Sequence, residues 1–170
     1  YTSYIDFDLF FDLNKDQLDA GAYQALYGYT GGTSNGWTIL NNLSPGRLIA
    51  PGQGFFVKSK AGGGTVSFTP EMRVSGASDD FILGREATSH FGFVKLNASS
   101  SDLDFHTYIY FNSNATSALD PGYDAALFGS STPSFSIYSH LVENNSGIPL
   151  SIQALNELAV NNAIIPLGLH

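Results

Sequence analysis

The sequence of 170 residues contains no cysteine. A disulfide needs two thiols, a zinc–thiolate site needs several, and a cysteine nucleophile needs one, so all three are excluded. This absence does not indicate a compartment, because a chain of this length buries enough apolar surface to fold without cross-links.

Basic residues are also scarce. Seven Lys and Arg stand against fifteen Asp and Glu, which gives a formal net charge of -8. A polyanion would be repelled, and no cluster of Lys or Arg exists to overcome the repulsion, so we expect no nucleic-acid partner. No apolar run reaches about 18 residues, so we also expect no membrane insertion.

The motifs of common catalytic sites are missing as well. The four histidines lie far apart and none has the H-x-x-x-H spacing of a metal site, and no G-x-S-x-G elbow is present. Aspartate pairs such as Asp102 and Asp104 exist, but a glycosidase needs two carboxyl groups across a cleft at about 5–9 Å. We therefore expect a protein that is not an enzyme, and a glycan-active hydrolase is the least favoured alternative.

The residues that are abundant favour an all-β fold. Thirteen Phe, nine Tyr and 18 Gly accompany a hydrophobic content of 43%. About ten short alternating runs are separated by turn residues every 8–12 positions, which is the pattern of a β-sandwich. We predict a single antiparallel, jelly-roll-like β-sandwich over residues 1–170, with one or two short helical turns and a candidate seam near residues 75–80.

The centre of this prediction is a hairpin within residues 49–69. Pro51-Gly52 suits the middle of a type II turn, because proline presets φ and glycine accepts a positive φ. Residues 54–58 then predict a strand, and residues 65–69 alternate Val and Phe with Thr and Ser, as a half-buried partner strand would. Three glycines within residues 61–64 supply the connection.

Other stretches predict the remaining elements. A short helical turn is expected near Leu9, Phe10 and Leu13, with Asp6 or Asp8 at its N-terminus. A turn with a capping carboxylate is expected over residues 120–124. A second helical turn is expected over residues 153–158. Strands are predicted over residues 22–29, 37–40, 91–96, 105–111, 135–138, 150–152 and 164–168, with residues 99–102 joining two of them as a hairpin.

Six segments of the sequence form a recognisable set: SYIDFD at 3–8, IAPGQGFFV at 49–57, FTPEMR at 68–73, GYDA at 122–125, LSIQAL at 150–155 and IPLG at 165–168. Together they resemble the β-rich modules found near the C-terminal end of large Bacteroidota proteins exported by the type IX secretion system. The resemblance implies an extracellular or outer-surface module in a multidomain protein, of which this chain is a fragment with neighbouring domains as partners. It carries over no catalytic residues.

Calcium is the favoured metal hypothesis. Asp12, Asn14, Asp16 and Asp19 place oxygen ligands at close intervals, as a loop around a hard cation requires. The spacing departs from an EF-hand, since Gln17 stands where glycine is needed. The alternative is a solvated helix end and turn, positions that Asp and Asn both favour.

Carbohydrate binding is the favoured ligand hypothesis. Sugar rings stack on exposed aromatic faces, and Tyr27, Tyr29 and the single tryptophan, Trp37, flank a Gly/Ser/Asn loop. The alternative is that these side chains are core residues, as aromatics in strands usually are. Tyr108 and Tyr110 offer a second platform, or pack on a second sheet.

The resulting expectation is a non-catalytic module for adhesion or glycan attachment, with an environmental or cell-surface polysaccharide as partner. The alternative is a structural spacer or assembly module beside a sorting domain. These two hypotheses predict different exposures of the aromatic side chains: a binding module exposes them in a line or groove, whereas a spacer buries them.

Overall fold

The computed structural model describes residues 1–29, 37–76, 92–129 and 132–170. Strands dominate this part of the chain, which confirms the all-β prediction; the two-layer sandwich stays a prediction. The strands are β1 (Tyr4–Asp6), β2 (Leu26–Tyr29), β3 (Trp37–Leu40), β4 (Leu48–Ile49), β5 (Arg73–Val74), β6 (Gly92–Ser99), β7 (Asp104–Phe111), β8 (Ala125–Ala126), β9 (Ile137–Ser139), β10 (Leu150–Leu155) and β11 (Leu167–Leu169).

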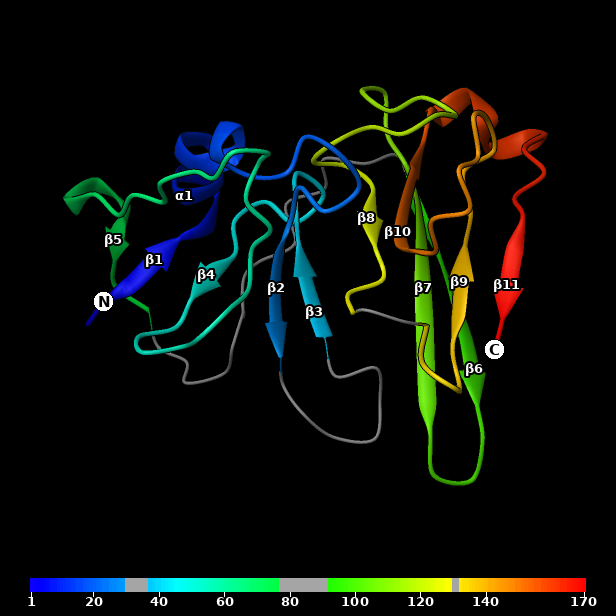
Figure 1. The fold of residues 1–170 in the computed structure, drawn as a ribbon, viewed down its shortest axis with the longest axis horizontal. Helices are drawn as coiled ribbons and strands as arrows, with labels where there is room; N and C mark the ends of the chain where they lie inside the picture. Colours follow the sequence, from blue (N-terminus) through cyan, green and yellow to red (C-terminus); the bar gives the residue numbers. More distant parts are fainter. Residues whose placement is uncertain (30–36, 77–91, 130–131) are drawn as a thin grey trace.

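These strands form three sheets, which follow one another from left to right in Figure 1. The first has the order β4-β1-β5, the second is the β2-β3 hairpin, and the third has the order β11-β9-β10-β7-β6, with β8 paired to β10. Most pairings are antiparallel, as predicted, but β10 runs parallel to β7. A parallel pair needs a long crossover, and residues 112–149 supply it.

Helical structure is more extensive than the one or two turns expected. It comprises α1 (Phe7–Asn14) and the 3-10 turns η1 (Lys15–Gln17), η2 (Pro70–Met72) and η3 (Glu157–Asn161). In the described part of the chain, no helix combines the length and the apolar character needed to cross a membrane.

The N-terminal helix α1 begins where the sequence predicts. The Asp6 carboxylate caps it by accepting a 3.0 Å hydrogen bond from the Leu9 amide. The predicted apolar face was partly wrong, because Leu9 and Leu13 are 47% and 52% exposed. Phenylalanine rings bury more apolar area than leucine side chains, so the helix turns Phe7, Phe10 and Phe11 inward. The buried positions have i, i+3, i+4, i+7 spacing: Phe7, Phe10, Phe11 and Asn14.

The turn at Pro51-Gly52 is confirmed, but the hairpin after it is wrong. The Gln53 amide donates to the Ala50 carbonyl at 3.2 Å and Gly52 has φ +72°, as a type II turn requires. Residues 54–58 do not pair with residues 65–69. Instead, Phe56 exchanges two backbone hydrogen bonds with Tyr27, of 2.8 and 2.9 Å.

A close backbone approach explains why residues 59–64 lie against η1. The Gln17 carbonyl accepts a 3.1 Å hydrogen bond from the Lys60 amide, and a Cβ added to Gly64 would lie 2.5 Å from the same oxygen. The glycines that suggested a hairpin connection therefore allow the chain to contact η1, and the two flanking segments bond to other elements.

The β6-β7 hairpin is confirmed, although its connection is residues 100–103 and not the predicted 99–102. Asp104 pairs with Ser99, and the Ser100 amide donates to the Leu103 carbonyl at 2.8 Å. One face of β7 is buried throughout, and it consists of Phe105, Thr107, Ile109 and Phe111.

The C-terminal elements follow the prediction except for one helical turn. β9, β10 and β11 overlap the predicted strands, but β10 continues through Gln153 to Leu155, so the helical turn predicted over residues 153–158 was wrong. All six β10 side chains are buried, and burial on both faces favours a central strand. A helical turn begins only after Asn156, whose side chain caps η3 at the Leu158 amide.

Hydrogen bonds join the segments before and after residues 77–91. The Ala126 amide donates to the Ala22 carbonyl at 2.7 Å, and the Asn42 amide donates to the Gly122 carbonyl at 2.9 Å. The candidate seam near residues 75–80 falls mainly on residues 77–80, which lie outside the described residues.

Candidate functional site

Four aromatic side chains gather at one end of the β2-β3 hairpin. We call Tyr29, Trp37, Phe56 and Phe128 the aromatic patch. Trp37 lies at its centre, with ring centroids 5.0 Å from Tyr29, 5.6 Å from Phe56 and 4.4 Å from Phe128. Tyr29 and Phe56 are 55% and 54% exposed, while Trp37 and Phe128 are half-buried. Two rings of the patch are therefore open to solvent, and they pack against two half-buried rings or lie beside them.

The local structure explains how these rings meet. Tyr29 and Trp37 are direct cross-strand partners in β2-β3, so their side chains lie on the same face. Phe56 is brought beside them by its backbone bridge to Tyr27. Phe128 follows β8, which pairs with β10 of the third sheet. The patch thus draws on both halves of the chain.

Tyr27 does not belong to this surface, and its assignment as a ligand-binding residue was wrong. Its side chain is fully buried, and its hydroxyl donates to the Ala126 carbonyl at 3.1 Å. Burial raises its pKa above the usual tyrosine range, and the charges of Tyr23 and Asp19 act in the same direction. Its ring centroid lies 4.7 Å from that of Phe128, so the buried Tyr27 ring packs against the aromatic patch from the core side.

The proposed calcium ligands are not brought together. Asp12 forms a 2.8 Å ion pair with Lys15, and the Asp16 carbonyl accepts a hydrogen bond from the Lys60 ammonium group. Asn14 is buried and fully engaged elsewhere. Within the described ranges, no three His, Asp or Glu side chains form a group able to hold a metal ion.

Asn14 and Asp19 each have a structural task instead. The Asn14 amide nitrogen donates to the Phe10 and Ser67 carbonyls at 2.8 and 2.9 Å, and its oxygen accepts from the Ser67 amide at 2.7 Å. The Asp19 carboxylate accepts a 3.1 Å hydrogen bond from the Gly21 amide and forms an ion pair with Lys58. The alternative of a helix end and a turn therefore describes this stretch.

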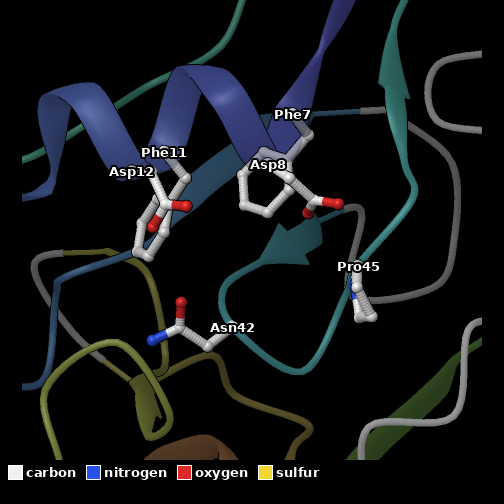
Figure 2. Close-up of a pocket in the computed structure, with 6 residues that line it drawn as sticks. All are labelled: Phe7, Asp8, Phe11, Asp12, Asn42 and Pro45. Atoms are coloured by element: carbon white, nitrogen blue, oxygen red, sulfur yellow. The ribbon is translucent and has the colours of Figure 1, made fainter.

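A shallow pocket of about 180 Å³ lies beside α1. Figure 2 shows Asp8 and Asp12 projecting from the helix above Asn42. The Asp8 carboxylate accepts a 2.8 Å hydrogen bond from the Gly46 amide, and burial raises its pKa. The pocket suits a small group that donates hydrogen bonds. Sequence reasoning missed it, although the i, i+4 spacing of the two aspartates was visible; its lining is Phe7, Asp8, Phe11, Asp12, Asn42 and Pro45.

A second aromatic row follows β7. The Tyr108 ring lies 5.8 Å from Tyr110 and 5.1 Å from His106, and the Lys95 ammonium group lies 5.5 Å from the Tyr108 ring centre. Both tyrosines are half-buried and pack on the core cluster that contains Ile152. The packing alternative therefore holds for this row. Burial lowers the pKa of His106, and Lys95 adds to this effect.

The predicted turn over residues 120–124 is confirmed and contains a buried carboxyl group. Gly122 has φ +79°, and the Tyr123 amide donates to the Asp120 carbonyl at 3.0 Å. The Asp124 carboxyl is fully buried and accepts 2.7 Å hydrogen bonds from the Ala154 and Asp120 amides. Burial raises the pKa of Asp124 to about 7, although both hydrogen bonds act in the opposite direction.

We expect this carboxyl group to make stability depend on pH. Its folded-state pKa of about 7 exceeds the ordinary value, so its stabilising contribution is complete at acidic pH and is lost as the pH rises through about 7. The excess unfolding free energy of the wild type over Asp124→Asn should fall by on the order of 3 kcal/mol between about pH 4 and about pH 8. Urea unfolding across this range measures the change, and a constant difference would contradict the expectation.

A family described as "Domain of unknown function (DUF8693)" matches residues 2–170. No curated protein matches, and no solved structure matches.

Proposed function

The chain belongs to the DUF8693 family over nearly its whole length, and from its exposed aromatic residues we propose that it is a non-catalytic carbohydrate-binding module. The aromatic patch would bind the sugar, and the rest of the domain would hold the patch in a fixed position at the surface. The observation that carries the proposal is the pair of exposed rings, Tyr29 and Phe56, on either side of Trp37.

The geometry of the patch supports this ligand class. The planes of Tyr29 and Trp37 are inclined by 54°, and those of Trp37 and Phe56 by 74°, so the rings form an angled surface and not a flat stack. A pyranose ring carries C–H groups on its faces, and these pack on aromatic rings while the hydroxyl groups stay hydrated or bond to polar neighbours. An angled surface can contact two faces of one sugar or two adjacent sugars.

The setting we propose is the cell exterior. The scarcity of charged residues and the resemblance to modules of type IX-secreted proteins support an extracellular or outer-surface location within a larger protein. Adhesion to an environmental or cell-surface polysaccharide is the role that fits such a setting. A spacer or assembly module would use the same patch as a contact for a neighbouring domain.

Replacing the central ring should strongly weaken binding. We expect wild-type protein to give signals on a glycan array, and Trp37→Ala to reduce affinity for the retained glycan at least about tenfold, because the platform loses its middle ring. Fluorescence titration of the wild type provides a direct readout, since Trp37 is the single tryptophan.

A matched control separates the patch from aromatic residues in general. Tyr1 is 40% exposed and stacks on Phe68, whose ring packs against Phe10 of α1, so Tyr1→Ala should leave glycan affinity unchanged. Phe56→Ala should weaken binding as Trp37→Ala does. An array without signals, or equal affinity in all variants, would favour the spacer function instead.

A further inference from the structure

The third sheet ends in an open strand edge. β11 lies outermost in the order β11-β9-β10-β7-β6, at the right of Figure 1, and β9 is its strand partner. Among the described residues, no strand pairs with the other side of β11. Open edges present unpaired backbone groups and are ready to accept another strand.

The hydrogen-bond pattern shows which groups face this open side. Ser136 and His170 exchange two 3.0 Å backbone hydrogen bonds, and the His140 amide donates to the Pro166 carbonyl at 2.9 Å. In an antiparallel ladder, hydrogen-bonded and non-hydrogen-bonded pairs alternate. Leu167 and Leu169 are therefore non-hydrogen-bonded partners of β9, and their N–H and C=O groups point outward.

The side chains at this edge are apolar and uncharged. Leu167 is 50% exposed, Leu169 is 73% exposed, and the nearby Ile164 is 86% exposed. Residues 158–169 contain no Asp, Glu, Lys or Arg, although the chain carries a net charge of -8. Natural edge strands are usually protected by charged side chains, and this one is not.

We propose that β11 is a dimerisation edge, and that its occupant is β11 of a second copy of this chain. In an antiparallel pairing with a two-fold axis at Gly168, Leu167 of one copy lies opposite Leu169 of the other. Each such pair exchanges two hydrogen bonds through the outward groups, so four bonds form and every outward N–H and C=O of both strands is satisfied. The third sheet then continues through both copies.

Gly168 fits the central position of this arrangement. The two copies of Gly168 form the non-hydrogen-bonded pair, where the Cα atoms approach to about 4.5 Å. Within the chain, a Cβ added to Gly168 would overlap the Tyr138 ring, so the glycine also allows this ring to cover β11. The tripeptide Leu-Gly-Leu is thus self-complementary in both backbone and side chains.

Charge favours a second copy at this edge over the edge at the other end of the same sheet. Two chains with a net charge of -8 repel each other over most of their surfaces, but residues 158–169 bring no like charges together. β6, at the opposite end of the same sheet, carries Lys95 in its middle, and pairing two copies there would place two ammonium groups close together.

Sedimentation velocity tests the proposal. We expect the wild type to be a dimer at about 100 μM and Leu169→Lys to raise the dimer dissociation constant at least about tenfold, because it places like charges at the new edge. Leu13 is a matched control, since it is 52% exposed on α1, and Leu13→Lys should dimerise as the wild type does.

Hydrogen–deuterium exchange of the wild type provides a second test that needs no variant. The amides of Leu167 and Leu169 should exchange more slowly as protein concentration rises, because both become hydrogen-bonded in the dimer. A wild type that stays monomeric at about 100 μM overturns the proposal and leaves the edge to a strand of another polypeptide. A dimer that Leu169→Lys leaves intact, with concentration-independent exchange at both amides, also overturns it.

Discussion

Asp124→Ala should destabilise the domain by about 3 kcal/mol, because it leaves two amides without an acceptor. The Asp124 carboxyl joins the Ala154 amide of β10 to the Asp120 amide of the turn, each at 2.7 Å, in a fully buried position. A loss of this size lowers the melting temperature of a domain of this length by about 10 °C. Thermal unfolding followed by circular dichroism at about pH 5 measures it.

The conservative variant at the same position makes the prediction more specific. Asp124→Asn keeps the size of the side chain and one acceptor oxygen, but turns an NH₂ group toward the second amide, so it should cost less than Asp124→Ala. Thr116→Ala is a control at the same turn, since its hydroxyl contacts Asp120 in an exposed position. Equal stability of the wild type and Asp124→Ala would show that the two hydrogen bonds contribute nothing.

Asn14→Asp should also lower the unfolding free energy of the domain, by about 3 kcal/mol or more. The substitution replaces the amide group that donates to the Phe10 and Ser67 carbonyls with a carboxyl oxygen. At neutral pH it would also place a negative charge beside two carbonyl oxygens in a buried site. Urea unfolding with and without added calcium chloride measures the effect.

The same variant separates a structural role from a metal-binding role. A calcium ligand would tolerate a change from amide to carboxylate and would bind the ion more tightly, so calcium would then restore or raise stability. We expect no such recovery. Asp12→Asn is the matched control, because it removes only an exposed ion pair with Lys15 and should change stability by less than about 1 kcal/mol.

Local signals in the sequence predicted local structure well. Asp6 as an N-cap, Pro51-Gly52 as a turn and the alternation along β7 were confirmed, since each depends on neighbours within a few residues. Partner choice was not predictable in the same way. Nothing in residues 54–58 indicates that Phe56 pairs with Tyr27, because that choice depends on contacts between distant segments.

Only two of the four residues of the aromatic patch were predicted, because the other two come from distant segments. Tyr29 and Trp37 were found because they flank one loop, and their cross-strand pairing follows from a hairpin. Tyr27 lies two residues before Tyr29 and points to the same side, yet one ring is buried and the other is exposed. Phe56 and Phe128 complete the patch from separate parts of the chain, and no spacing rule connects them to Trp37.

The parallel pairing of β10 with β7 affects how the chain folds during synthesis. β10 is a central strand of the largest sheet, yet it lies about forty residues after the strand it pairs with in parallel. During synthesis from the N-terminus, β6 and β7 emerge as a hairpin whose inner edge has no neighbour until residues 150–155 follow. We therefore expect nascent chains stalled before β10 to be captured by chaperones or to aggregate, and chains that include it to acquire protease resistance abruptly.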